Sequence, residues 1–399
     1  MKAPRLFARR AAAVAIAGCL LVVIAFVFDA APLFVPAVAF IAIGVFAPAW
    51  VWITARGAQA HRILNVERIV EDEPLEASIE VRRGRLGLPG AEVIDPFTGS
   101  RLQLAGPLSP IRGARTASVR VVARFGRRGL HALAAPRLIV SDPLELARVQ
   151  TESAAPPQQL LVLPRTEPVR WLRTDRGRRF EMPDGRASSE ALAAVNIDGL
   201  RPYRPGTPAS RIHWPAVARG AGLIERRLQP DGDNRPLVVL DARNPSSAAP
   251  AELLDAAVRA AASLVLEFAR SGGCGLLLPG EQRATAIDRE LSAWSAAYAR
   301  LAMVHGGVGS QAPALGPTAG RIGPMIYVAA SPIDRLAALF SGPGRGLTVL
   351  VVPNRALVAG RPPGIRGRMV ATLDVSGCRG FVLGSRREVE RVGPEASVA

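Results

Sequence analysis

Near the middle of the chain the sequence reads Leu237-Val238-Val239-Leu240-Asp241. A continuous apolar run that ends in a single acidic residue is typical of a strand buried on both faces of a parallel sheet. Residues 250–270 then carry apolar side chains at helical spacing, and residues 274–278 form another short apolar run. This order of strand, helix and strand predicts a right-handed crossover and a parallel sheet covered by helices.

The alternation continues toward the C-terminus. It predicts an α/β, Rossmann-like doubly wound domain over residues 237–390, followed by a tail at 391–399. Further helices are expected at residues 283–303 and 332–340, and further strands at 325–329, 347–352 and 381–383.

Two apolar runs, at residues 11–28 and 33–53, open the chain. Each is long enough to cross a bilayer as a helix, about 27 Å or more. The loop between them has no basic residue, and basic residues flank the outer ends instead: Lys2, Arg5, Arg9, Arg10, Arg56 and Arg62. This asymmetry predicts a transmembrane hairpin over residues 1–60 with both termini in the cytoplasm. The alternatives are a signal peptide, which lacks a good cleavage site here, and a buried hairpin in a soluble protein.

After the second run the pattern changes to short alternating segments bounded by Gly and Pro. Leu75, Ala77, Ile79 and Val81 alternate with polar residues, which is typical of a half-buried strand. We expect a small antiparallel, sandwich-like β-domain over residues 61–153. Residues 154–236 then form a linker region that contains an arginine-rich loop at 165–186.

Arginine dominates the charge of this 399-residue chain, which has 50 basic and 33 acidic residues and a formal net charge of +17. Because the arginines are scattered, an anionic membrane surface is a better partner for them than nucleic acid, which is not expected to bind. The three cysteines and four histidines are isolated from one another, so neither a zinc site nor a disulfide framework is expected. Lys2 is the only lysine, which excludes a P-loop nucleotide hydrolase, and no cofactor is expected.

The most distinctive local chemistry lies between residues 198 and 220, where arginines crowd around aromatic residues and a Pro-Gly turn. The candidate functional residues there are Arg201, Tyr203, Arg204, Pro205, Gly206, Arg211, His213, Trp214 and Arg219. Aromatic side chains that hold guanidinium groups serve protein interfaces and core ordering alike, so we interpret this segment as a connector or partner-docking motif.

Two other classes of function remain open. One is a hydrolase that uses Ser210 and His213 together with Asp198, which lie close in sequence. The other is a binder of anionic lipid or nucleic acid through the arginine-rich loop at 165–186.

These pieces together resemble a bacterial family, the domain-of-unknown-function family fifty-eight. The specific part of the resemblance is Leu200-Arg201-Pro202-Tyr203-Arg204-Pro205-Gly206, followed by Arg211-Ile212-His213-Trp214 and Ala218-Arg219. The family usually has Asp where this chain has Thr207 and His213, so the pairing of the motif's arginines is expected to differ here. His213 is expected to be a satisfied structural histidine.

The resemblance implies a non-enzymatic, membrane-anchored interaction or scaffold protein with a von Willebrand factor A-like domain. Relatives are typically encoded beside MoxR-type AAA+ ATPases, which implies such an ATPase as the partner in a chaperone-like or envelope-assembly role. It also implies a multi-pass location in the bacterial cytoplasmic membrane, with the soluble domains in the cytoplasm.

A-type domains often bind a divalent metal through an Asp-x-Ser-x-Ser loop after the first strand. In this chain the loop starts at Asp241 and has Arg243 and Pro245 at the serine positions, followed by Ser246 and Ser247. We therefore interpret it as a degenerate metal-site loop and expect no metal. Asp241 is expected to pair with Arg243 or with a nearby helix N-terminus.

Overall fold

A computed structural model describes residues 5–88, 90–96, 99, 101–103, 115–152, 156–172, 197–203, 212–220, 222–228, 235–243, 251–306, 313, 324–331, 348–362 and 369–383. The chain divides into two compact units, one made of Met1–Gly126 and Leu130–Val162, the other of Arg127–Gly129 and Leu163–Ala399. The helix expected at 332–340 and the tail at 391–399 lie outside the described residues.

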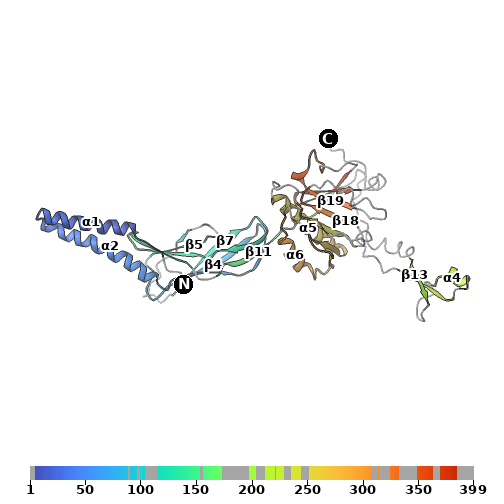
Figure 1. Cartoon of the computed structure of the whole chain (residues 1–399), viewed down its shortest axis with the longest axis horizontal. Helices are drawn as coiled ribbons and strands as arrows, with labels where there is room; N and C mark the ends of the chain where they lie inside the picture. Colours follow the sequence, from blue (N-terminus) through green and yellow to red (C-terminus); the bar gives the residue numbers. More distant parts are fainter. Residues whose placement is uncertain are drawn as a thin grey trace. The chain divides into compact units, whose positions relative to one another are not determined.

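Two apolar helices lie near the start of the first unit (Figure 1). α1 spans Arg9–Val27 and α2 spans Phe34–Ala55, with a 3-10 turn, η1 (Ala31–Leu33), just before α2. At 1.5 Å per residue they measure about 28 and 33 Å, and both are long and apolar enough to cross a membrane. The predicted pair of helices is confirmed, with ends shifted by one or two residues.

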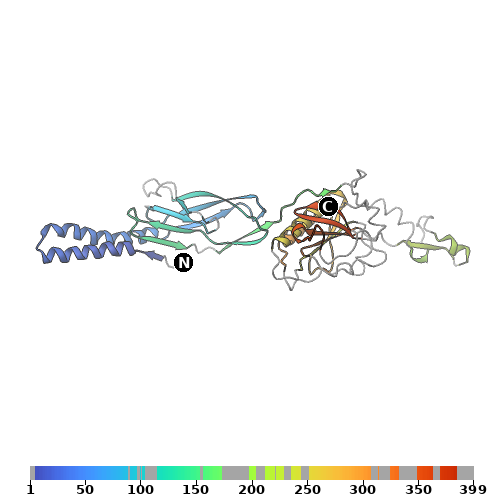
Figure 2. The same cartoon turned by 90° about the horizontal axis from the view of Figure 1, so that it is seen from above.

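The two helices lie side by side (Figure 2) and approach each other through small residues. Buried small residues include Ala11, Gly18 and Ala25 on α1, and Ala37 and Gly44 on α2. A Cβ atom at Gly18 would lie 2.8 Å from the Ala37 carbonyl oxygen, and one at Gly44 would lie 2.7 Å from the Ala11 carbonyl oxygen. Glycine therefore permits the close approach of the two backbones.

The rest of the first unit consists of β-strands. These are β1 (Arg5–Phe7), β2 (Gln59–Leu64), β3 (Arg68–Val70), β4 (Pro74–Arg82), β5 (Gly90–Ile94), β6 (Arg101–Gln103), β7 (Thr116–Arg124), β8 (Gly129–Leu133), β9 (Arg137–Ser141), β10 (Arg148–Glu152) and β11 (Gln158–Leu163). They form three sheets in the orders β1-β10-β9-β5-β6, β2-β4-β7 and β3-β11-β8. The β-domain extends beyond the expected residues 61–153, because β1 pairs with β10 and β11 joins β3 and β8.

The C-terminal end of α2 is part of the β-domain core. Val51 and Ala55 are buried in the same apolar cluster as Ile79, Val93 and Leu138. The helix therefore ends inside the domain that follows it, without a spacer.

Arg62 was expected to lie on the surface as one of the charges that flank the membrane, and this expectation is wrong. Its side chain is only 1% exposed and forms an ion pair with Asp95, which is fully buried. The reason is the period of two along β2, which places Arg62 on the same inward face as Ala60.

A mixed sheet of eight strands organises the second unit. Its strands are β12 (Arg170–Trp171), β15 (Leu237–Asp241), β16 (Cys274–Leu277), β17 (Thr285–Ile287), β18 (Met325–Ala329), β19 (Thr348–Pro353), β20 (Val370–Val375) and β21 (Cys378–Leu383). The order is β12-β20-β21-β19-β18-β15-β16-β17. The pairs β16–β15, β15–β18 and β18–β19 are parallel, as predicted.

The flanking strands are antiparallel, and there the prediction of a parallel sheet is wrong. β20 and β21 are joined by Ser376 and Gly377, which both have positive φ. This tight turn leaves no room for a crossover and forces an antiparallel hairpin.

Both described long helices of this unit pack on one face of the sheet. α5 (Ala251–Gly272) and α6 (Trp294–Ala302) share an apolar cluster with Val238, Leu240 and Ile326. The prediction of one helix over residues 283–303 is wrong for the first half of that range. There Thr285–Ile287 pairs with β16, and the Asp288 carboxylate accepts hydrogen bonds from Ser292, so the chain turns before α6 begins.

A second face of the same sheet is also buried, around Val239, Tyr327 and Leu350. The helix expected to cover it falls outside the described residues, so the doubly wound arrangement stays a prediction. The unit also contains a two-stranded antiparallel sheet, β13 (Ile197–Pro202) with β14 (Ile224–Leu228), and the short helix α4 (Trp214–Ala218).

Candidate functional site: a filled carboxylate at the sheet edge

Asp241 is the last residue of β15, at the carboxyl edge of the parallel strands. The chain runs from β15 to β16 on one side and later returns to β18 on the other side of β15. Open α/β sheets bind their ligands where the strand order reverses in this way, outside the carboxyl ends of the strands. The position of Asp241 therefore makes it the first candidate for a functional group.

The Asp241 carboxylate is fully buried and accepts hydrogen bonds from two side chains and one backbone group. Arg243 donates from Nε to Oδ1 at 3.0 Å, from Nη2 to Oδ2 at 2.6 Å, and from its backbone N–H to Oδ1 at 2.9 Å. The Tyr327 hydroxyl, from β18, donates to Oδ2. The expected pairing of Asp241 with Arg243 is present.

The electrostatics of the three groups reinforce one another. The pKa of Arg243 is raised, chiefly by its hydrogen bond to Asp241, although burial opposes the shift. Burial raises the pKa of Tyr327 above its ordinary value, and the charge of Asp241 raises it further. Arg243 is thus held as a cation and Tyr327 as a neutral donor, and both keep the carboxylate occupied.

This arrangement limits the chemistry of Asp241. A divalent cation would have to displace a guanidinium group that already bonds to both carboxylate oxygens. Within the described residues, no three His, Cys, Asp or Glu side chains gather in a way that could hold a metal ion. Ser246 and Ser247, the remaining hydroxyls of the loop, lie outside the described residues.

The structure places only part of the arginine-rich motif. Tyr203 donates its backbone N–H to the Leu223 carbonyl at 2.9 Å, which ties the end of β13 to the start of β14. Trp214 is 58% exposed at the first position of α4, and Arg219 is exposed just after it. The backbone of Arg201 lies in β13. Arg204, Pro205, Gly206, Thr207, Ser210 and Arg211 lie outside the described residues, as does most of the arginine-rich loop at 165–186.

His213 is the N-cap of α4. Its Nδ1 accepts a hydrogen bond from the Ala216 backbone N–H at 3.2 Å, and its own backbone N–H donates to the Ile224 carbonyl at 2.9 Å. This matches the expected structural histidine, because the ring nitrogen closes the first turn of a helix.

Tyr327 is the residue of the site that the sequence analysis did not name. The signal for it was present: β18 reads Met-Ile-Tyr-Val-Ala, with one phenol in an otherwise apolar strand. A buried tyrosine hydroxyl needs a hydrogen-bond partner, and a neighbouring parallel strand that ends in Asp supplies one.

The comparisons with known proteins give no further assignment. No model of a known protein family matches the sequence, and no curated protein matches it either.

Proposed function

We propose that this protein is a non-enzymatic, membrane-anchored interaction protein of the family described above, with a von Willebrand factor A-like domain in the second unit. In this proposal the hairpin spans the bacterial cytoplasmic membrane and the soluble domains face the cytoplasm. A MoxR-type AAA+ ATPase binds the soluble part, and the pair acts in a chaperone-like or envelope-assembly role.

The observation that carries the proposal is the Asp241 carboxylate at the sheet edge, because both of its oxygens already accept hydrogen bonds. In this proposal Asp241 corresponds to the first residue of the A-type metal loop, and its carboxylate already accepts hydrogen bonds from Arg243 and Tyr327. A carboxylate in that state is a poor metal ligand and a poor general base, because both roles need free lone pairs. In this proposal the sheet edge supports partner binding instead of chemistry.

An exposed aromatic residue in the motif supports docking as well. Trp214 presents more than half of its surface to solvent, although it follows the buried Ile212 by two positions. Exposed tryptophans are enriched among the residues that dominate binding at protein interfaces. The ATPase as the specific partner rests on the family resemblance.

The test is co-purification of the full chain from solubilised bacterial membranes, with bound proteins identified by mass spectrometry. We expect an AAA+ ATPase in amounts comparable to the bait. Trp214→Ala should reduce its recovery at least about tenfold, as expected when a hot-spot residue worth about 1.4 kcal/mol or more is lost. Thermal unfolding should be nearly unchanged, because the side chain is exposed.

The matched control is Val358→Ala, which shortens another exposed apolar side chain in the same unit. It should leave recovery of the ATPase unchanged. Recovery of no ATPase with the parent chain contradicts the proposed partner, and equal losses with both variants contradict the role given to Trp214.

A further inference from the structure

We propose that the base of the hairpin binds the headgroups of anionic phospholipids. The hairpin base is here defined as residues 5–11, 56–57, 83–85 and 142–148, all in the first unit. The proposal rests on the membrane anchoring proposed above and names the lipid chemistry that this anchor selects.

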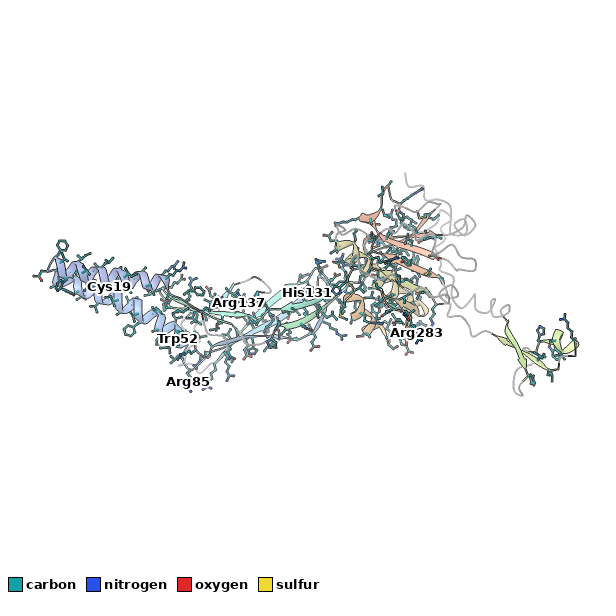
Figure 3. The ribbon with its side chains drawn as sticks, viewed as in Figure 1. Cys19, Trp52, Arg85, His131, Arg137 and Arg283 are labelled. Carbon is teal, nitrogen blue, oxygen red and sulfur yellow. The ribbon has the colours of Figure 1, made fainter. Side chains whose placement is uncertain are left out.

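Backbone contacts bring these segments to the end of the hairpin that joins the β-domain. β1 pairs with β10 so that Phe7 lies opposite Arg148, and the Ala11 N–H donates to the Leu146 carbonyl at 3.2 Å. The first turn of α1 is therefore held against the β9–β10 turn. In Figure 3 Trp52 and Arg85 lie at this end of the hairpin, whereas Cys19 lies midway along it.

The residues that follow α2 are joined to the same region. Gly84 packs so closely on Arg56 that a Cβ atom at Gly84 would lie 2.1 Å from the Arg56 carbonyl oxygen. No side chain larger than hydrogen fits there, so the turn of residues 83–85 is fixed beside the end of the helix.

The hairpin base is strongly basic. It contains the arginines Arg5, Arg9, Arg10, Arg56, Arg83, Arg85 and Arg148 and only two acidic residues, Asp142 and Glu145. Asp142 is buried and accepts hydrogen bonds from the backbone N–H groups of Leu144 and Ala147, which closes the turn. Glu145 pairs with Arg148 at 2.8 Å and lies 3.8 Å from Arg10. Seven arginines less two acidic residues leave the hairpin base with a formal net charge of +5. At the opposite end of the hairpin, residues 28–33, the only charged residue is Asp29.

Large apolar side chains lie among these arginines and are left exposed. Phe7 is 57% exposed and Leu144, at the tip of the β9–β10 turn, is 63% exposed. The Arg56 guanidinium stacks over the Trp52 ring at 3.5 Å, close to the end of α2. Exposed apolar groups, a tryptophan and several arginines at the base of the hairpin fit the boundary where acyl chains meet phosphate groups.

Anionic phospholipid is the occupant that this chemistry selects. A zwitterionic headgroup also offers a phosphate, but its choline or ethanolamine cation cancels the charge that the arginines attract. At an anionic surface each arginine contributes enough attraction to change the local lipid preference about fivefold.

The experiment uses the full chain in nanodiscs of phosphatidylcholine that contain a small fraction of brominated lipid. Bromine quenches tryptophan fluorescence at short range, so quenching reports which lipid lies beside Trp50 and Trp52. At equal mole fraction we expect brominated phosphatidylglycerol to quench more strongly than brominated phosphatidylcholine. Arg9→Gln/Arg10→Gln should lower this preference at least about fivefold, and Trp50→Phe/Trp52→Phe should remove the quenching.

The matched control is Arg120→Gln/Arg137→Gln, which removes the same charge from exposed positions on β7 and β9 outside the hairpin base. It should leave the preference unchanged. Equal quenching by the two brominated lipids in the parent chain overturns the lipid proposal. An equal loss of preference in the control variant overturns it as well. Neither result contradicts the membrane anchor. Absence of quenching by either lipid overturns the membrane anchor itself.

Discussion

The ion pair between Arg62 and Asp95 is the most deeply buried pair of charges described in the β-domain. Both side chains are at most 1% exposed, and Arg62 also donates from Nη2 to the Ala134 carbonyl at 3.0 Å. The backbone carbonyl of Arg62 in turn accepts a hydrogen bond from Gln158 in β11 at 3.0 Å. One residue thus connects β2 to the loop before β9 and to β11.

Removing one partner of this pair should destabilise the β-domain strongly. Asp95→Ala leaves a buried guanidinium without its carboxylate, and we expect a loss of about 3–5 kcal/mol in the free energy of unfolding. Replacing both partners by apolar residues, as in Arg62→Met/Asp95→Leu, should cost much less. Denaturant unfolding followed by circular dichroism measures both, with the exposed Arg137→Ala as control; a double variant as unstable as the single one contradicts the argument.

The phenol of Tyr327 predicts a loss of stability at alkaline pH. Its pKa is raised from the ordinary value of 10.0, so between that pH and the folded pKa the native state keeps a proton that the unfolded state has lost. The contribution of this phenol to stability is then full below about pH 10 and falls as the pH rises further. Tyr327→Phe should make thermal unfolding less dependent on pH in this range, and an unchanged dependence would show that another group titrates.

At the scale of single elements, the hairpin depends on two glycines. A side chain at Gly44 would overlap the Ala11 carbonyl oxygen and the Ala15 side chain. Gly44→Leu should therefore separate the helices and cost about 1–3 kcal/mol or more, since an overpacked interface must shift its backbone. Val45→Leu, one position along and 57% exposed, is the matched control. Thermal unfolding and protease resistance in nanodiscs measure the difference, and equal behaviour of the two variants contradicts the close packing.

The elements that could be predicted from the sequence are those with a strong period or a long apolar run. The two apolar helices and β15, β16, β18 and β19 are of this kind. The turn between β16 and α6 could not be predicted, because residues 283–303 have an apolar pattern compatible with one helix. A local hydrogen bond decides the structure there: the Asp288 carboxylate accepts hydrogen bonds from Ser292 and closes a turn. The spacing of apolar residues does not reveal this turn.

The candidate site could be predicted in part. Asp241 and Arg243 are two residues apart, so their pairing follows from sequence proximity. Tyr327 lies 86 positions from Asp241, and only the parallel register of β15 and β18 brings the two together. Contacts across a sheet depend on strand order, which a single sequence does not contain.

At the scale of the whole chain, the proposed topology places the Asp29–Pro32 loop on the outer side of the cytoplasmic membrane. We expect Ala30→Cys, in a Cys19→Ala background, to react with an impermeant maleimide on intact spheroplasts. Cys274 and Cys378 should not react with the maleimide, because burial raises the pKa of each thiol to about 12. Arg137→Cys, in the β-domain, should react only after the membrane is opened, and the reverse pattern would place the soluble domains outside.

The position of β1 before α1 has a practical consequence for production of the protein. The hairpin is an insertion within the β-domain: one edge strand precedes it, and the end of α2 supplies Val51 and Ala55 to the core. A truncated gene that starts after the hairpin would lack that strand and part of that core. Its product would expose the unpaired edge of β10 and an apolar gap, which favours aggregation. Crystallisation or binding studies should therefore keep the β-domain together with its helices in detergent or lipid.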